Sequence, residues 1–380
     1  MATRKSNGDG SIRQRSDGRW EGRYTAPDGR QRSVYGKTKT ACREKLRQAQ
    51  AEILTGVYLE PSRVTVGEWL TMWLEAQAER VKPTTQQTYR AYVDRYLAPA
   101  LGEIRLDKLA PVHVQRAFSD LARRLSPGSV MSVRTFLASA LNAAVKLELI
   151  RSNPLHKLPP PRKPDEEPMT LVDRKDFPAF VAAARQTKHG AEMILLLQTG
   201  IRSGELRGLR WADVDLDAAT MTVSRQITYL TKGPVVQSPK SGRIRRIVLM
   251  PETVALLRRH RADQAAQRLA HGGWIDDDLS ADLVFRRPDG RPLAGNALRA
   301  PAAQVGASIG LPGLHPHDLR HSYAVAALRS GIDVKTVQNN LGHATAAMTL
   351  DVYAGYTDDM GRAAAERLSQ YWQANALGSN

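Results

Sequence analysis

Proline is concentrated in one short stretch near the middle of the chain. Between Asn153 and Pro168, six of the sixteen residues are proline. Such a stretch cannot continue a helix, because proline lacks the backbone N–H and its ring clashes with the preceding turn, and it favours extended polyproline II structure. We therefore predict a linker over residues 159–168 with separate domains on either side. For 380 residues, two or three domains are expected.

The chain carries a large excess of positive charge. Its 55 Lys and Arg against 38 Asp and Glu give a formal net charge of +17. Residues 1–50 hold 13 of the basic residues and 5 of the acidic ones, so close to half of the surplus lies in about an eighth of the chain. Clustered Lys and Arg attract phosphate backbones, so a nucleic acid is the expected partner.

Other features exclude several classes of protein. The sequence has no run of about 18 apolar residues, and its first residues lack the apolar segment of a signal peptide. We therefore expect a soluble protein that is not exported by that route. The single cysteine, Cys42, excludes an intramolecular disulfide framework and a cysteine-based zinc finger.

The basic N-terminal segment is predicted to form three strands and a helix. Asp-Gly pairs at 17–18 and 28–29 separate short alternating runs over 11–15, 19–25 and 30–35, and Asp-Gly is a strong hairpin signal. A helix is expected over 39–54. Alternate strand residues share a face, so Arg19, Glu21 and Arg23 should form a basic face opposite a small aromatic core. The candidate DNA-binding residues of this segment are Arg13, Arg15, Arg19, Arg23, Arg30 and Arg32. The alternative is a solvated basic hairpin with no partner.

Residues 63–158 are predicted to be helical. Thr65 and Glu68 have the spacing of a capping box, and Pro111 and Pro127 stand where helices would begin. The faces opposite the apolar stripes carry Lys82, Arg90, Arg95 and Arg134, which could lie against DNA. We take Lys82 and Arg90 as candidates for DNA contact; a solvated helical face is the alternative for each.

The C-terminal part combines helices with a few strands. Helices are expected over 176–185, 191–198 and 251–268, and strands over 221–228 and 235–249 with a turn at Lys240. The last third is again predicted to be helical.

Three short segments of this part contain residues that can act on a phosphate. In residues 198–210 a helix ends at Gly200, and Arg202 precedes the next helix, where its guanidinium and nearby N–H groups can bind a phosphate. Residues 315–321 hold three histidines and Arg320. His343 is followed ten residues later by Tyr353. Each segment alone is a weak signal, because a lone His or Tyr is more often a packed residue.

In order, spacing and context, these segments resemble the tyrosine recombinases, the site-specific recombinase family that includes many phage and integrative-element integrases. The resemblance rests on TGIRSGEL, the lysine of SPKSGRIRRIVL, HDLRH, LGH and the tyrosine after TLD. It implies a multidomain, mainly α fold with small β-sheets. Residues 1–57 would form an arm-type DNA-binding domain with a three-stranded sheet and a helix. Residues 63–158 would form a helical core-binding, SAM-like domain. Residues 169–380 would form an α+β catalytic domain with a C-terminal tail helix over 358–374.

The resemblance also implies a chemical role for each residue. Tyr353 would attack a scissile DNA phosphate, leaving a 3′-phosphotyrosyl link and a free 5′-hydroxyl; this link conserves the ester energy, so resealing needs no ATP. The remaining roles are phosphate binding by Arg202, Arg320 and His343, acceptance of the tyrosine proton by His317, and protonation of the leaving oxygen by Lys240. Lys240 is preferred to Lys232 because the turn followed by RRIVL resembles the family hairpin. The scheme needs no metal and no cofactor.

Three neighbours of these residues have open or structural roles. Glu205 could orient Arg202 or cap the helix that follows it. His315 lies one residue off the spacing expected of the proton acceptor, and His321 is expected to be structural.

The predicted function is a site-specific recombinase, an integrase of a phage or other mobile element. The resemblance implies that it acts through a Holliday junction as a homotetramer on core and arm-type sites of double-stranded DNA in the bacterial cytoplasm. An excisionase or a DNA-bending protein is a candidate further partner. The alternatives are a type IB topoisomerase-like enzyme and a catalytically silent DNA-binding regulator. Competent side chains at every expected catalytic position favour an enzyme, and the basic N-terminal segment favours recombination.

Overall fold

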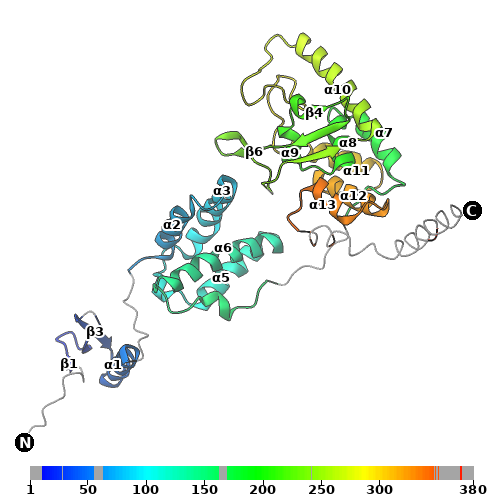
Figure 1. The fold of residues 1–380 in the computed structure, drawn as a ribbon. Coiled ribbons are helices and arrows are strands. Elements are labelled where there is room, and N and C mark those ends of the chain that lie inside the picture. The colour runs from blue at the N-terminus through cyan, green and yellow to red at the C-terminus, as the bar shows by residue number, and fades with distance from the viewer. Residues whose placement is uncertain are drawn as a thin grey trace, which may run out of the picture. The chain divides into compact units, whose positions relative to one another are not determined.

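A computed structural model describes residues 11–27, 29–54, 63–161, 169–240 and 242–345, together with 347, 350 and 369. The chain is mainly helical with small antiparallel sheets, as predicted (Figure 1). It divides into two compact units, Met1–Glu166 and Glu167–Asn380. This division falls within the predicted linker, while the assignment of arm-type, core-binding and catalytic domains stays a prediction. Tyr353, the predicted tail helix and residues 162–168 lie outside the described residues.

The N-terminal segment forms the predicted sheet and helix. Strands β1 (Ser11–Gln14), β2 (Trp20–Thr25) and β3 (Gln31–Gly36) pair antiparallel in that order, and α1 (Lys39–Leu54) packs on the sheet. A Cβ placed on Gly22 would lie 3.2 Å from Cys42 Sγ, which shows how closely helix and sheet approach. Cys42 and Leu46 are buried in this contact. The core is therefore built around these two side chains, and the aromatic residues predicted for it, Trp20 and Tyr24, are only partly buried.

The opposite face of this sheet is less basic than predicted. Its centre is Glu21, which is 3% exposed. Arg13 Nε donates to Glu21 Oε2 at 2.7 Å, Ser33 Oγ donates to Oε1 at 2.8 Å, and Arg23 Nε donates to Oε1 at 3.3 Å. These hydrogen bonds, that of Arg13 first, lower the pKa of Glu21 to about 2. The face is thus a pair of arginines joined by a carboxylate.

The rest of the first unit is helical. Its elements are α2 (Val66–Gln77), α3 (Pro83–Tyr92), the π-helix η1 (Val93–Leu97), α4 (Ala98–Leu101), η2 (Leu106–Lys108), α5 (Pro111–Ala122), α6 (Pro127–Lys146) and η3 (Pro154–Lys157). The predicted capping box is confirmed: Thr65 N donates to Glu68 Oε2 at 2.8 Å, and Glu68 N donates to Thr65 Oγ1 at 3.3 Å. Trp69 is buried and donates Nε1 to Ala140 O at 3.0 Å, which ties α2 to α6.

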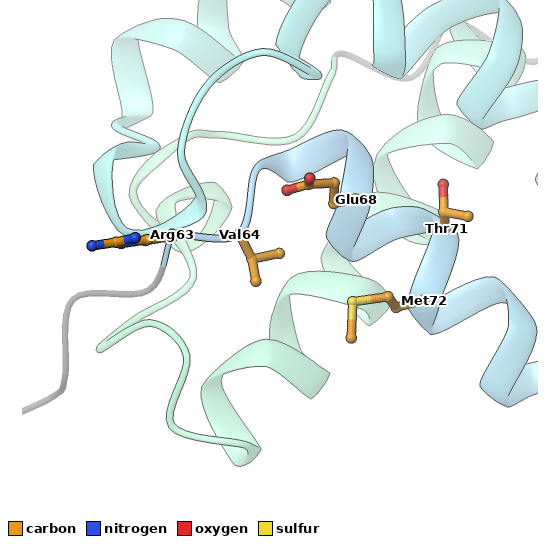
Figure 2. A pocket seen from close by; sticks show the side chains of 5 residues that line it. All are labelled: Arg63, Val64, Glu68, Thr71 and Met72. Carbon is orange, nitrogen blue, oxygen red and sulfur yellow. The ribbon is translucent and has the colours of Figure 1, made fainter.

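A shallow pocket lies at the start of α2. Figure 2 shows Glu68, Thr71 and Met72 projecting from α2 beside Arg63 and Val64, which precede it. None of the predicted catalytic residues lines this pocket. It therefore adds nothing to the chemistry of the catalytic segments, which belong to the second unit.

One residue expected to face DNA has a structural role. Arg134 of α6 donates Nη2 to Leu155 O at 3.1 Å and to Leu158 O at 2.7 Å. Leu155 O also accepts from the backbone N of Leu158 at 3.1 Å, whereas Leu158 itself follows the short helix, where a nearby arginine can satisfy a free carbonyl. Arg134 therefore ties α6 to the segment around η3.

The second unit is an α+β assembly. Its elements are α7 (Phe177–Arg185), α8 (Gly190–Thr199), α9 (Ser203–Gly208), η4 (Trp211–Asp213), β4 (Val214–Asp215), β5 (Thr220–Val223), β6 (Gln226–Leu230), β7 (Gly233–Gln237), β8 (Arg245–Val248), α10 (Pro251–Ala270), α11 (Arg299–Ser308), α12 (Pro316–Arg329) and α13 (Val334–Leu341). Helix α8 is buried on all sides, as its run Met193–Leu197 shows, and contacts α7, α10 and α12. Among the described helices, none is long and apolar enough to cross a membrane.

The strands differ from the prediction. Residues 221–228 form parts of two strands in different sheets: β5 pairs with β4 and β8, and β6 pairs with β7. The break falls at Ser224 and Arg225, whose side chains both bond to Asp213, at 3.3 Å and 2.5 Å. The strands predicted on either side of the turn at Lys240, over 235–249, are β7 and β8, but they belong to different sheets and do not pair with each other. Lys240 therefore lies in the connection between two sheets.

Candidate active site

Arg202 occupies the junction between α8 and α9. The chain leaves α8 at Gly200 with φ 66°, and Arg202 is the N-cap of α9. Its backbone N donates to Glu205 Oε2 at 2.9 Å and its Nη1 donates to Glu205 Oε1 at 3.0 Å, so Glu205 both caps the helix and orients the guanidinium. Arg202 Nη2 also donates to Gly342 O at 3.2 Å. This bond brings residues 140 positions apart into one site.

Arg320 is held beside Arg202 by two carbonyls. It lies on α12, is 2% exposed, and donates Nη1 to Gly200 O at 2.6 Å and Nη2 to Leu341 O at 2.7 Å. Burial and the nearby charge of Arg202 lower its pKa to about 9, so it remains protonated at neutral pH. Two consecutive carbonyls at the end of α13, those of Leu341 and Gly342, thus accept hydrogen bonds from the two arginines.

Two of the predicted histidines border the arginines. Desolvation of the ring, followed by His321, Arg320 and Arg202, lowers the pKa of His317 to about 4, although the residue as a whole is exposed. Burial and then Arg320 and Arg202 lower the pKa of His343 to about 4 as well. Both rings are therefore neutral at pH 7, the state in which an imidazole can accept a proton.

The other two histidines of residues 315–321 have different environments. His315 is the N-cap of α12, and its backbone N donates to Asp318 Oδ2 at 2.7 Å, so it begins the helix that carries Arg320. His321 packs edge-on against His317 with ring centroids 4.5 Å apart. It therefore supports the His317 ring.

The predicted catalytic set is only partly assembled in the described residues. Arg202, Arg320, His317 and His343 come together, whereas Tyr353 lies outside the described residues. Lys240 is exposed in the connection between β7 and β8. Lys232 is also exposed and lies at the tip of the β6–β7 hairpin, so the hairpin tip expected for Lys240 belongs to Lys232. The preference for Lys240 continues to rest on the resemblance.

The candidate DNA-binding residues lie on and around the N-terminal sheet and at the two ends of α3. Arg13 and Arg23 lie on the open face of the N-terminal sheet, and Arg32, which pairs with Tyr24, shares the face that packs on α1. Arg19 pairs with Asp17 at 2.7 Å, Arg15 lies over the Tyr35 ring, and Arg30 is exposed. Lys82 and Arg90 are exposed at the two ends of α3.

Sequence reasoning missed one residue of the site. Arg245 on β8 is buried and donates to both oxygens of Glu205. The adjacent Arg246 is exposed. The alternation of a strand could have shown that only one of the two arginines faces inward, but not which one.

Acidification is expected to destabilise the second unit in part through His343. Its pKa is about 4 when folded and near 6.5 when unfolded, so between these values the unfolded state binds more protons and the free energy of unfolding falls as the pH falls. Urea unfolding at pH 7 and pH 5 should therefore show a smaller difference for His343→Gln than for the wild type. The exposed His271→Gln is the control for replacing a histidine. An equal difference in His343→Gln and wild type would contradict the assignment.

Comparison with known proteins identifies the family. The phage integrase family matches residues 171–359, and the family described as phage integrase, N-terminal SAM-like domain, matches residues 65–122. The chain belongs to the phage integrase family. It is therefore a tyrosine recombinase, an enzyme that breaks and rejoins DNA.

Individual members of the family resemble most of the chain. A tyrosine recombinase XerC-like protein of Caldanaerobacter subterraneus is 26% identical over 340 residues, which covers 85% of this chain and 87% of that protein. The solved structure of the Tn1549 transposon integrase with a circular intermediate DNA has a TM-score of 0.70 at 23% identity, covering 80% of this chain and 99% of that one. A lambda integrase tetramer bound to a Holliday junction has a TM-score of 0.57 at 17% identity, covering 88% and 95%. These two structures share the fold of this tyrosine recombinase.

Proposed function

We propose that this tyrosine recombinase is the integrase of a phage or another mobile element, which integrates or excises that element at specific DNA sites. The observation that carries the proposal is the pairing of Arg202 and Arg320 around one turn, residues 341–343, with two neutral histidines beside them. Membership of the integrase family, and the circular intermediate DNA bound by the Tn1549 integrase, support an element that moves.

Cleavage is a transfer of one phosphate ester bond. Tyr353 Oη attacks the phosphorus, the bond from phosphorus to the 5′-oxygen breaks, and a 3′-phosphotyrosyl link forms. Negative charge on the nonbridging oxygens grows in the transition state, where Arg202 and Arg320 stabilise it. His343 donates a further hydrogen bond to the phosphate.

Two protons move during this step. His317, whose ring is unprotonated at pH 7, accepts the proton of the tyrosine hydroxyl. Lys240, on its exposed connection, donates a proton to the leaving 5′-oxygen. Strand joining is the reverse reaction with a 5′-hydroxyl from the partner duplex, and two such exchanges pass through a Holliday junction.

Covalent capture tests the proposal. Wild-type protein is incubated in EDTA with a nicked duplex that carries the junction sequence flanking the element, so that the cut strand is lost and the adduct accumulates. A protein–DNA adduct resistant to denaturation is expected, and Tyr353→Phe should give none. No adduct with wild type would contradict both the recombinase and the topoisomerase-like alternative and favour the silent regulator. An adduct that persists in Tyr353→Phe would contradict the choice of nucleophile.

The N-terminal segment is proposed to bind arm-type DNA sites through Arg13, Arg15, Arg19, Arg23, Arg30 and Arg32, and α3 to contact core DNA through Lys82 and Arg90. Arg13 and Arg23 share Glu21, so a phosphate must compete with this carboxylate for their guanidinium groups.

Deleting residues 1–57 should lower the salt dependence of binding to long DNA sites. Each phosphate neutralised on duplex DNA contributes roughly 0.9 to the slope of log affinity against log salt. We expect a shallower slope for the truncated protein on a long site and unchanged cleavage of a core site, measured by titration at several salt concentrations. The same slope before and after deletion would show that the segment does not bind DNA.

The active assembly is proposed to be a homotetramer on two DNA sites, in which tail helices join the protomers. An excisionase or a DNA-bending protein is proposed as a further partner in one reaction direction. The lambda integrase tetramer on a Holliday junction supports the tetramer. We also propose a bacterial cytoplasmic location, with the protein on the nucleoid when bound; the proposed substrate and the bacterial relative support it.

A further inference from the structure

Arg245 is a buried cation beside the catalytic arginines that the reaction described above does not use. It begins β8, and its side chain is 7% exposed. Arginine is almost never fully buried without partners, because removing a charge from water is costly. Its contacts therefore show what the charge is for.

The hydrogen bonds of the Arg245 side chain lead to the phosphate-binding segments. Nη1 donates to Glu205 Oε1 at 3.0 Å, Nη2 donates to Oε2 at 2.6 Å, and Nε donates to Asn340 O at 2.7 Å. Glu205 is the residue that orients Arg202, and Asn340 precedes the turn of residues 341–343 that accepts bonds from Arg202 and Arg320. One guanidinium thus contacts two of the segments that bind the phosphate.

The fit around this guanidinium is tight. Gly342 has φ 64°, and a Cβ placed there would lie 3.0 Å from Arg245 Nη1 and 3.2 Å from its Cζ. Arg202 Nη2 donates to the carbonyl of the same glycine. The turn is therefore held between Arg245 and Arg202.

The balance of charge gives Arg245 a function. The Glu205 side chain is fully buried and faces two arginines. Burial alone would raise its pKa, but the bonds and charge of Arg245, with those of Arg202, lower it, so Glu205 is ionised. If Arg202 were the sole counter-ion, it would be drawn fully to the carboxylate, and the phosphate site would lose one positive charge.

We propose that Arg245 is a positioning residue for DNA cleavage. It neutralises Glu205, so that the charge of Arg202 remains available to the scissile phosphate, and it fixes the Asn340 carbonyl at the start of the turn that carries His343. This inference rests on the proposed function, since it assigns Arg202 to the phosphate.

The test compares charged and uncharged substrates. Arg245→Gln and its matched control Arg246→Gln, an exposed neighbour that bonds Thr220 Oγ1, are assayed in the full chain by single-turnover cleavage. One duplex has the normal scissile phosphate, and the other has a methylphosphonate, which lacks the negative charge that Arg202 would bind. We expect Arg245→Gln to slow cleavage of the phosphate on the order of 100-fold, as a misplaced catalytic group does, and to slow cleavage of the methylphosphonate less than about 10-fold. Arg246→Gln should change neither rate by more than about 3-fold.

A role limited to folding predicts a different result. A misfolded fraction would reduce both rates by the same factor, so equal losses on the two substrates would overturn the proposal. Should Arg245→Gln fail to fold, Glu205→Gln is compared with the double variant Glu205→Gln, Arg245→Gln, in which no buried carboxylate needs a counter-ion. Within that pair, removing Arg245 should cost less than about 5-fold, and a loss near 100-fold would overturn the proposal. Wild-type adduct formation is read separately and tests only the proposed function.

Discussion

Arg320→Gln is expected to slow single-turnover DNA cleavage about 100- to 1000-fold. One preorganised donor to a developing negative charge is worth about that factor, and Arg320 is proposed to supply such donors to the phosphate. Two of its N–H groups are committed to Gly200 O and Leu341 O, which leaves the remaining ones for DNA. The loss should appear in the rate of adduct formation at saturating protein.

The same substitution should also destabilise the protein. The two carbonyls that Arg320 satisfies are in a buried setting, and each buried polar group left without its partner costs about 1–3 kcal/mol. Urea unfolding measures this cost. Arg329→Gln is the matched control, because it lies on the same helix and removes a partly exposed ion pair with Asp173, which is worth at most about 1 kcal/mol. Cleavage by Arg320→Gln within about 10-fold of wild type would contradict its place at the phosphate.

Gly200→Ala is expected to lower the free energy of unfolding by about 2–5 kcal/mol. The position has φ 66°, where a side chain costs about 1–2 kcal/mol, and the new Cβ would lie 2.3 Å from Tyr323 Cδ1 and 2.7 Å from Leu341 Cδ2. Overpacking of this kind adds about 1–3 kcal/mol. Because Gly200 O holds Arg320 and Leu341 O holds it from the other side, cleavage should be lost as well.

A second glycine separates the two causes. Gly313 has φ 80°, and a Cβ added there would meet nothing within 4 Å, so Gly313→Ala should cost only the backbone contribution of about 1–2 kcal/mol. Urea unfolding and cleavage rates are measured for both variants. Equal destabilisation of the two would show that Tyr323 and Leu341 move aside without cost.

Helix positions could be predicted from the sequence because the signals that start a helix are local. The Thr65–Glu68 capping box and the prolines that begin α5 and α6 act within one turn, and the structure has helices at those places. The strands near residue 225 could not be divided correctly, because their break depends on Asp213, which lies 11 and 12 positions earlier in the chain. Contacts of that kind are absent from any local pattern.

The sequence predicted which residues are the candidate catalytic ones, but not which residues hold them in place. The motifs pointed to Arg202, Arg320, His317 and His343, and the structure brings these four together. The same motifs did not reveal that Arg245 shares Glu205 with Arg202, since Arg245 and Arg246 look alike in sequence. Which of two adjacent arginines enters the interior is decided by the register of β8 against β5.

Because Arg320 bonds to two backbone carbonyls, substitutions at different positions of the site should differ in how much they disturb the fold. The guanidinium of Arg320, which is proposed to bind the phosphate, is bonded to carbonyls at the ends of α8 and α13, so altering it alters the folded unit itself. Lys240 lies outside these contacts, on an exposed connection. To trap this enzyme on intact DNA, Lys240, the proposed proton donor, should therefore be replaced and Arg202 and Arg320 kept. Replacing the exposed lysine leaves the packed interior unchanged, whereas replacing the arginines does not.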